Sequence, residues 1–220
     1  MPSTTAATTA TQLVSITTAL LASGGIAALS LFDVPELQSQ PASRSLPSIR
    51  WLFSRGSHIF PQAAFLSSAG FAYLAYEALP RSQKSITSLL RFGANGPKVN
   101  GFLVAAALAL SIGPVTSLMI PTNFTLIKMN EERGGTRSER SAREGNAQPG
   151  DRSAVDSVNS KGEAAEFTDL SGPQARTQRD STREDDERVK QLLDKFALMN
   201  GVRAVLIGAG GLIGLWAALL

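Results

Sequence analysis

The chain has 220 residues, a formal net charge of +3 and 18% charged residues, values that are ordinary for a water-soluble protein. This average conceals four long stretches with almost no charge and one segment, Glu131–Arg188, that holds most of the charge. The chain has no cysteine and one histidine, His58, which excludes disulfides, thiolate chemistry and a histidine-based metal cluster.

Each of the four apolar stretches is long enough for one helix to cross a bilayer. A helix rises about 1.5 Å per residue, so about 20 residues cross a hydrocarbon core of about 30 Å. The stretches lack the polar face that a helix of a soluble protein shows. We therefore predict an all-α fold, a four-helix transmembrane bundle with spans at about 13–32, 59–79, 101–120 and 202–220.

The first predicted span ends at Asp33-Val34-Pro35, where a charge and a proline together should stop a helix. The preceding residues, Met1–Gln12, contain no Lys or Arg. A cleaved signal peptide has a basic start and a shorter apolar core. We therefore expect this first helix to be retained.

Prolines also mark the next two spans. The second is predicted to begin after Arg55-Gly56 and to end at Glu77-Ala78-Leu79-Pro80. The third contains Pro114, which a membrane helix tolerates where neighbouring groups satisfy the freed carbonyl, and it is predicted to stop at Pro121.

The fourth span follows an amphipathic stretch, Val189–Met199, which we expect either to lie on the membrane surface or to extend the helix. Within the span, Gly208–Gly214 is similar to a phosphate-binding loop, but no strand precedes it. Gly210 and Gly214 instead form a small-xxx-small pair, which predicts close helix packing.

Residues 131–188 are predicted to form a disordered charged loop between spans three and four. They carry 24 charged side chains and only four bulky apolar ones, too few to offset the entropy of ordering. On this ground residues 134–183 should be dispensable for folding and activity. Acidic and basic residues are mixed in the segment, which argues against nucleic-acid binding.

Lysine and arginine near the membrane ends predict the topology. They are more numerous around the 131–188 segment and in the loop after the first span than in the loop of residues 81–98. We therefore expect a multi-pass protein of the endoplasmic reticulum or a related endomembrane, with lumenal termini. The cytosolic 131–188 loop could then contact enzymes of the same pathway.

Because the helices alternate in direction, polar residues at their ends should gather at one membrane face. These residues are Asp33, Arg55, His58, Gln62, Asn123, Asn200 and Arg203. Asn200 and Arg203 follow Phe196 by four and seven residues, so the three share one side of a helix. Arg203 should face the bundle interior, because a lipid-facing charge is costly; the alternative is an arginine that only anchors the helix at the interface.

His58 is the one side chain with an ordinary pKa near neutrality. It could act as a general base, or it could be an interfacial histidine solvated by water and headgroups.

Two runs resemble the small four-span membrane proteins that include the fungal anthrone oxygenases. Gly113–Asn123, followed by Leu126, resembles the proline-, threonine- and asparagine-containing end of their third helix. Phe196–Arg203 is similar to the W-x-x-L-N-x-x-R entry to their fourth helix, with phenylalanine in place of the tryptophan.

The similarity extends to Arg55-Gly56 and Pro61 at the entry to the second helix and covers all four spans, but not the charged loop. It implies oxidation of a polyketide anthrone to the anthraquinone by O₂ in secondary metabolism, a monooxygenase reaction that uses no cofactor. Arg203 would stabilise the enolate with Asn123 and Asn200. His58, or a water held by Arg55 and Asp33, would remove the methylene proton.

The alternative is a non-catalytic membrane scaffold or accessory protein that holds other enzymes through the charged loop. Under this hypothesis Asn123, Asn200 and Arg203 only fix helix ends and register, so their replacement would damage folding rather than turnover.

Overall fold

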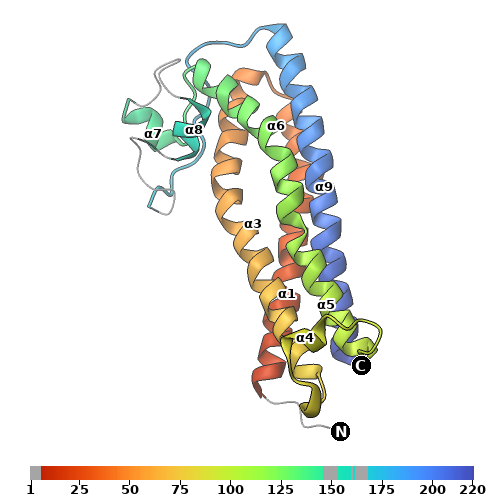
Figure 1. The fold of residues 1–220 in the computed structure, drawn as a ribbon. Coiled ribbons are helices and arrows are strands. Elements are labelled where there is room, and N and C mark those ends of the chain that lie inside the picture. Colours follow the sequence, from red (N-terminus) through yellow and green to blue (C-terminus); the bar gives the residue numbers. More distant parts are fainter. Residues whose placement is uncertain (1–5, 146–152, 160, 162–167) are drawn as a thin grey trace. The chain divides into compact units, whose positions relative to one another are not determined.

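A computed structural model describes residues 6–145, 153–159, 161 and 168–220 of the chain (Figure 1). Within these ranges the regular structure is entirely helical, which confirms the predicted all-α fold. The chain divides into two compact units. The first contains the chain up to Ala27, Phe60–Thr116 and Gly201–Leu220, and the second contains Ala28–Ile59 and Ser117–Asn200.

Three helical stretches are long and apolar enough to cross a membrane: Ala6–Gln38, Pro97–Glu132 and Arg183–Leu219. They contain the predicted first, third and fourth spans. The predicted second span lies in α3 (Ala42–Ala78), which is less apolar because polar side chains such as Gln62, Ser67 and Ser68 interrupt it. Its crossing of the membrane stays a prediction.

The first unit packs parts of four long helices around an apolar core. Its elements are α1 (Ala6–Ala28), the second half of α3, η2 (Arg81–Gln83), α4 (Ile86–Leu89), α5 (Pro97–Leu110), the start of α6 (Ile112–Glu132) and the end of α9 (Arg183–Leu219). Ile26 of α1, Phe71 of α3, Phe102 of α5 and Ile207 of α9 are fully buried in this core. The rings of Phe71 and Phe102 stack with centroids 6.5 Å apart.

Small residues hold the helices of the first unit close together. A Cβ added at Gly210 would lie 3.0 Å from the carbonyl oxygen of Ala105 in α5, and one at Gly214 would lie 2.3 Å from the ring of Phe71. Close packing is therefore the role of these glycines, as their spacing predicted. Ser23 of α1 adds a hydrogen bond to a carbonyl of α9, that of Ala204, at 2.8 Å.

The second unit has its own core between α3, α6 and α9. Its elements are the π-helical turn η1 (Leu29–Asp33), α2 (Val34–Gln38), the first half of α3, most of α6, α7 (Glu139–Arg143), α8 (Ala154–Val158) and the first part of α9. Leu46 of α3, Met119 and Leu126 of α6, and Leu193 of α9 are buried together. Phe196 of α9 adds an edge-to-face contact with Phe53, with centroids 5.1 Å apart.

The first helical stretch does not stop at Asp33-Val34-Pro35, which corrects the prediction. The chain widens into the π-helical turn η1, where the Val34 amide donates to the Leu29 carbonyl, and then continues as α2. A proline ring would clash with the carbonyl four residues before it in a regular α-helix. Because Pro35 lies in the first turn of α2, the wider turn accommodates it.

The predicted stop at Pro121 is also wrong. The break lies earlier, at Ser111 between α5 and α6, three residues before Pro114. Pro114 therefore falls in the first turn of α6, where a missing amide is harmless. Pro121 lies inside α6. The helix continues past it because Leu126 and Met129 pack into the core of the second unit.

Helix α3 begins at Ala42, well before Arg55-Gly56, and ends at Ala78 close to the predicted Pro80. Side chains near the start of α9 satisfy its first amides. The Ala42 amide donates to Asp186 Oδ1 at 2.7 Å, and that of Ser43 to Ser181 Oγ at 3.2 Å. Local sequence patterns cannot predict these caps, because the donors and acceptors are more than a hundred residues apart.

Part of the segment predicted to be disordered, 131–188, has defined structure. Helices α6 and α9 reach into it, and α7 and α8 lie within it, whereas residues 146–152, 160 and 162–167 are outside the described residues. The amide of Thr177 donates to the Ser43 carbonyl of α3 at 2.8 Å. Hydrogen bonds between polar groups order these parts of the segment in place of an apolar core.

We expect Gly210→Ala to destabilise the protein, since the new methyl group would press on the backbone of α5, which cannot move aside as a side chain could. The expected loss is about 1–3 kcal/mol of unfolding free energy in detergent. Gly113→Ala is the matched control, because a Cβ there meets no atom within 4 Å. Equal stability of the two variants would contradict the packing role of Gly210.

Candidate functional site

Asn123 and Asn200 both lie on helix faces that form the core of the second unit. Asn123 follows Met119 by four residues and precedes Leu126 by three, so it shares their buried side of α6. Asn200 follows Phe196 by four residues on α9 and has no exposed surface. The side-chain oxygen of Asn123 is buried and has no hydrogen-bond partner among the described residues.

Arg203 belongs to the first unit and follows Asn200 by three residues in α9. Its side chain is 7% exposed. This burial favours the predicted inward orientation over an arginine that reaches to the interface. Asn200 and Arg203 therefore continue, over successive turns, the buried side of α9 that Phe196 begins.

Arg55 and His58 lie on a different face of α3 from its core residues Leu46, Ile49 and Phe53. His58 follows Trp51 by seven residues, and this spacing places both on one side of the helix. The sequence placed these residues at the start of a helix, whereas α3 begins at Ala42 and holds them in its interior. It did not predict that they face away from the core where Asn123 and Asn200 lie.

Arg55 holds the charged segment against α3. Its Nη2 donates to the Asp169 carbonyl, and its guanidinium lies 5.3 Å from the centre of the Trp51 ring. The indole Nε1 of Trp51 donates to the Ser171 carbonyl at 3.0 Å. Two neighbouring side chains of α3 thus bind the backbone of residues 169–171.

His58 has a defined hydrogen-bonding environment. Its Nδ1 lies 3.0 Å from the Ser54 carbonyl oxygen and 3.1 Å from Ser57 Oγ. A carbonyl can only accept a hydrogen bond, so the proton belongs on Nδ1 in the neutral ring and Nε2 is left as the basic nitrogen.

Arg50 and Asp169 are buried polar residues that sequence reasoning missed. Arg50 donates from Nε to Ser157 Oγ at 3.0 Å and from Nη2 to the Ser157 carbonyl at 2.7 Å, which fixes α8 to α3. Asp169 accepts hydrogen bonds from the hydroxyl groups of Ser138 and Ser171. No sequence motif predicts the burial of Asp169, since the residues around it in the sequence are mostly polar.

The carboxylate of Asp169 is held in its ionised form. Burial acts to raise its pKa, but hydrogen bonds from Ser138 and Ser171 and the positive charge of Arg137 outweigh burial, and the pKa is lowered from its ordinary value. Folding of this part of the segment therefore depends on an ionised carboxylate.

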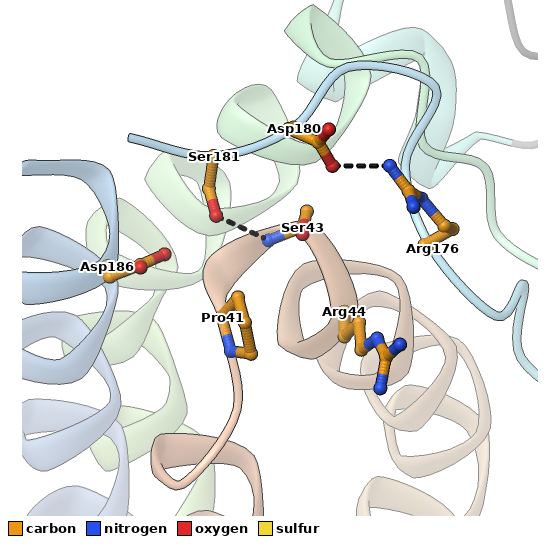
Figure 2. Close-up of a pocket in the computed structure, with 7 residues that line it drawn as sticks. All are labelled: Pro41, Ser43, Arg44, Arg176, Asp180, Ser181 and Asp186. Carbon is orange, nitrogen blue, oxygen red and sulfur yellow. Dashed lines mark hydrogen bonds and ion pairs between the residues drawn. The ribbon is translucent and has the colours of Figure 1, made fainter. Parts of the chain in front are cut away.

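A cavity of about 530 Å³ lies in the second unit where α3 begins (Figure 2). Its lining consists of Pro41, Ser43, Arg44, Arg176, Asp180, Ser181 and Asp186. Arg176 pairs with Asp180 across its rim, and no aromatic or large aliphatic side chain lines it. Such a charged lining does not suit a flat apolar ligand, which apolar walls would bind.

Comparison with known proteins identifies the class to which this fold and these residues belong. Residues 50–213 match the model of the family described as anthrone oxygenase, so the chain belongs to the anthrone oxygenase family. The match confirms the resemblance seen in the sequence and includes Arg55, His58, Asn123, Asn200 and Arg203.

One similar protein is "Anthrone oxygenase encC" of Aspergillus fumigatus. It is 30% identical over 215 residues, which cover 94% of this chain and 92% of the relative. No solved structure matches the chain. The alignment thus covers nearly the full length of both proteins and supports an oxygenase-type enzyme.

We expect Arg50→Leu to release α8 from α3, because the Ser157 carbonyl would lose a charge-assisted hydrogen bond worth about 1.5–3 kcal/mol. Limited proteolysis should then cut the 131–182 segment faster than in the wild type. Arg44→Leu is the matched control on the same helix, since Arg44 is exposed. Equal cleavage of both variants would contradict the role of Arg50 and would support the prediction that the whole segment is a dispensable loop.

The lowered pKa of Asp169 predicts release of the same region in acid. The ionised form stabilises the folded state, so its contribution is complete above the ordinary aspartate pKa of about 4 and is lost as the pH falls through the lower folded-state pKa. Proteolysis with an acid-active protease should therefore show protection at pH 5 that declines progressively as the pH falls below about 4. Asp169→Asn should remove that pH dependence; an unchanged profile would refute the role of this carboxylate.

Proposed function

We propose that this protein oxidises a polyketide anthrone to the anthraquinone with O₂ and without a cofactor, as a monooxygenase of secondary metabolism. Family membership and the burial of Asn200 and Arg203 on one side of α9 support the proposal. Polar and charged side chains within membrane helices are costly, and they are retained mainly where they function.

The proposed reaction balances without an external reductant. The anthrone methylene loses a proton to give an enolate, which transfers one electron to O₂ to form superoxide and a carbon radical. These two recombine and take up a proton, giving a hydroperoxide. Loss of its second C–H proton and cleavage of the O–O bond then release water and leave the new carbonyl. The methylene carbon supplies all four electrons that O₂ accepts.

Arg203 is proposed as the cationic partner of the enolate oxygen. Its guanidinium would stabilise the negative charge that develops as the proton leaves, and the amides of Asn123 and Asn200 would donate hydrogen bonds to the same anion or to the substrate carbonyl. The core residues beside the two amides, Met119 and Phe196, are apolar. Apolar surroundings suit the flat tricyclic substrate and exclude water from its radical.

His58 is proposed as the base that acts through a water molecule, because it lies on a different face of α3 from the core residues. The Ser54 carbonyl oxygen, 3.0 Å from Nδ1, supports this role, because a proton on Nδ1 makes Nε2 the basic nitrogen of the neutral ring. Arg55 would then act as a positioning residue one turn earlier on α3, held by its contact with Asp169.

We further propose that the protein is a four-span protein of the endoplasmic reticulum or a related endomembrane. The three membrane-length helices support membrane insertion. The basic residues around the 131–188 segment favour a cytosolic position for it.

We expect Arg203→Ala to lower anthrone oxidation by roughly 10²-fold or more, the scale of losing one anion-stabilising donor. Arg203→Lys should recover only part of this loss, because an ammonium does not reproduce the planar guanidinium. Asn200→Ala should impair the same step, so the double variant should be less impaired than the product of the single effects. The measurement is quinone formed per folded protein, after subtraction of spontaneous air oxidation.

Arg188→Ala is the control for this series, since Arg188 is an exposed arginine of the same helix. Wild-type turnover at the spontaneous rate would contradict the oxygenase proposal. Loss of folded protein in all the site variants, with no separate effect on turnover, would favour the scaffold hypothesis.

A further inference from the structure

The turn between α3 and α5 presents apolar side chains to its surroundings. Ile86, Leu90 and Phe92 are 76%, 79% and 52% exposed. Ile86 and Leu90 are four residues apart and share one side of the turn that α4 begins, whereas Leu89 packs against the core of the first unit. The turn therefore has an anchored side and an unpartnered apolar side.

Hydrogen bonds within the turn fix this arrangement. Ser85 caps α4 by accepting from the Ser88 amide at 3.1 Å, and Asn95 Nδ2 donates to the carbonyls of Ser88 and Leu89 at 3.0 and 3.2 Å. Asn100 Nδ2 donates to the Phe92 carbonyl at 3.0 Å. The exposed apolar side chains thus stand on a folded turn whose backbone groups are largely satisfied, not on an extended strand of chain.

All charged side chains of this turn are positive. Residues 80–101 contain Arg81, Lys84, Arg91 and Lys98 and no acidic residue. Lys84 pairs with Glu77 of α3 at 2.8 Å, while the described residues offer no carboxylate to Arg81, Arg91 or Lys98. The turn is also continuous with Pro97–Glu132, a stretch long enough to cross the membrane, so it lies where a bilayer surface would be.

We propose that residues 81–98 form an interfacial anchor that binds the bilayer surface. Ile86, Leu90 and Phe92 insert at the boundary between headgroups and acyl chains, and Arg91 and Lys98 bind the lipid phosphates. Apolar side chains beside basic ones are the composition that binds such an interface, with a preference for anionic lipids. The partner is thus a phospholipid surface, and the binding depends neither on the anthrone nor on the residues proposed for its oxidation.

The absence of cysteine from the chain allows a direct test with single labels. Leu90→Cys is labelled with an environment-sensitive fluorophore in nanodiscs of phosphatidylcholine with phosphatidylglycerol. Exposed residues of α9 provide the references, Glu184→Cys for water and Leu212→Cys for lipid. We expect the Leu90 label to be quenched by shallow spin-labelled lipid and several-fold less accessible to aqueous iodide than the Glu184 label.

A Leu90 label as accessible to iodide as the Glu184 label would overturn the proposal. So would a label protected from both quenchers, because protein would then cover this surface. A second experiment tests the charges. The Leu90 label should be quenched more strongly by spin-labelled phosphatidylglycerol than by spin-labelled phosphatidylcholine, and the double substitution Arg91→Gln with Lys98→Gln should abolish this difference. An unchanged preference would refute the headgroup contacts; circular dichroism verifies that each variant is folded.

Discussion

The hydrocarbon core of a bilayer contains no water, so every polar group within it needs a partner in the protein or in a ligand. The first unit follows this constraint through small polar residues: Ser23 donates to the Ala204 carbonyl and Ser68 to that of Ala106. These bonds bring helices together without a large polar group. Asn200 and Arg203 are different, because their size and, for Arg203, its charge exceed what helix packing requires.

The second unit shows that a segment can be ordered with little apolar surface. Arg50 and Asp169 are buried there, and each is hydrogen-bonded to serine groups. A buried charge with well-placed partners is costly to disturb, because loss of one partner leaves the other without compensation. The order of this region is therefore sensitive to single substitutions, although an apolar residue count suggests that the region is dispensable.

The sequence predicted the all-helical fold, three of the four proposed membrane-length stretches and the tight packing at Gly210, since these follow from composition and local spacing. It failed at Pro35 and Pro121, because the effect of a proline depends on whether a wider turn or distant packing compensates for the lost hydrogen bond. The ordered parts of the 131–188 segment depend on pairs such as Thr177 and Ser43, which are far apart in the chain. No local pattern encodes such pairs.

The candidate residues divide in the same way. The sequence placed them near helix ends, but they lie inside α3, α6 and α9, because these helices continue beyond the predicted apolar spans. The face of α3 on which His58 lies depends on which side forms the core. Leu46 and Phe53 lie on the core side of α3, and the helical repeat then places His58 on a different side of the helix. On α9 the core residue Phe196 and the proposed site residues share one side, so the same repeat correctly predicted that Asn200 and Arg203 are buried.

The proposed anthrone oxidation would need few polar groups. In the proposed reaction the substrate would supply the electrons, so the protein would have to favour one event, the formation of the enolate. In apolar surroundings a guanidinium attracts an anion more strongly than it does in water, whereas a neutral anthrone gains little from it. Burial of Arg203 would thus stabilise the developing enolate more than the bound substrate, and that difference is what accelerates a reaction.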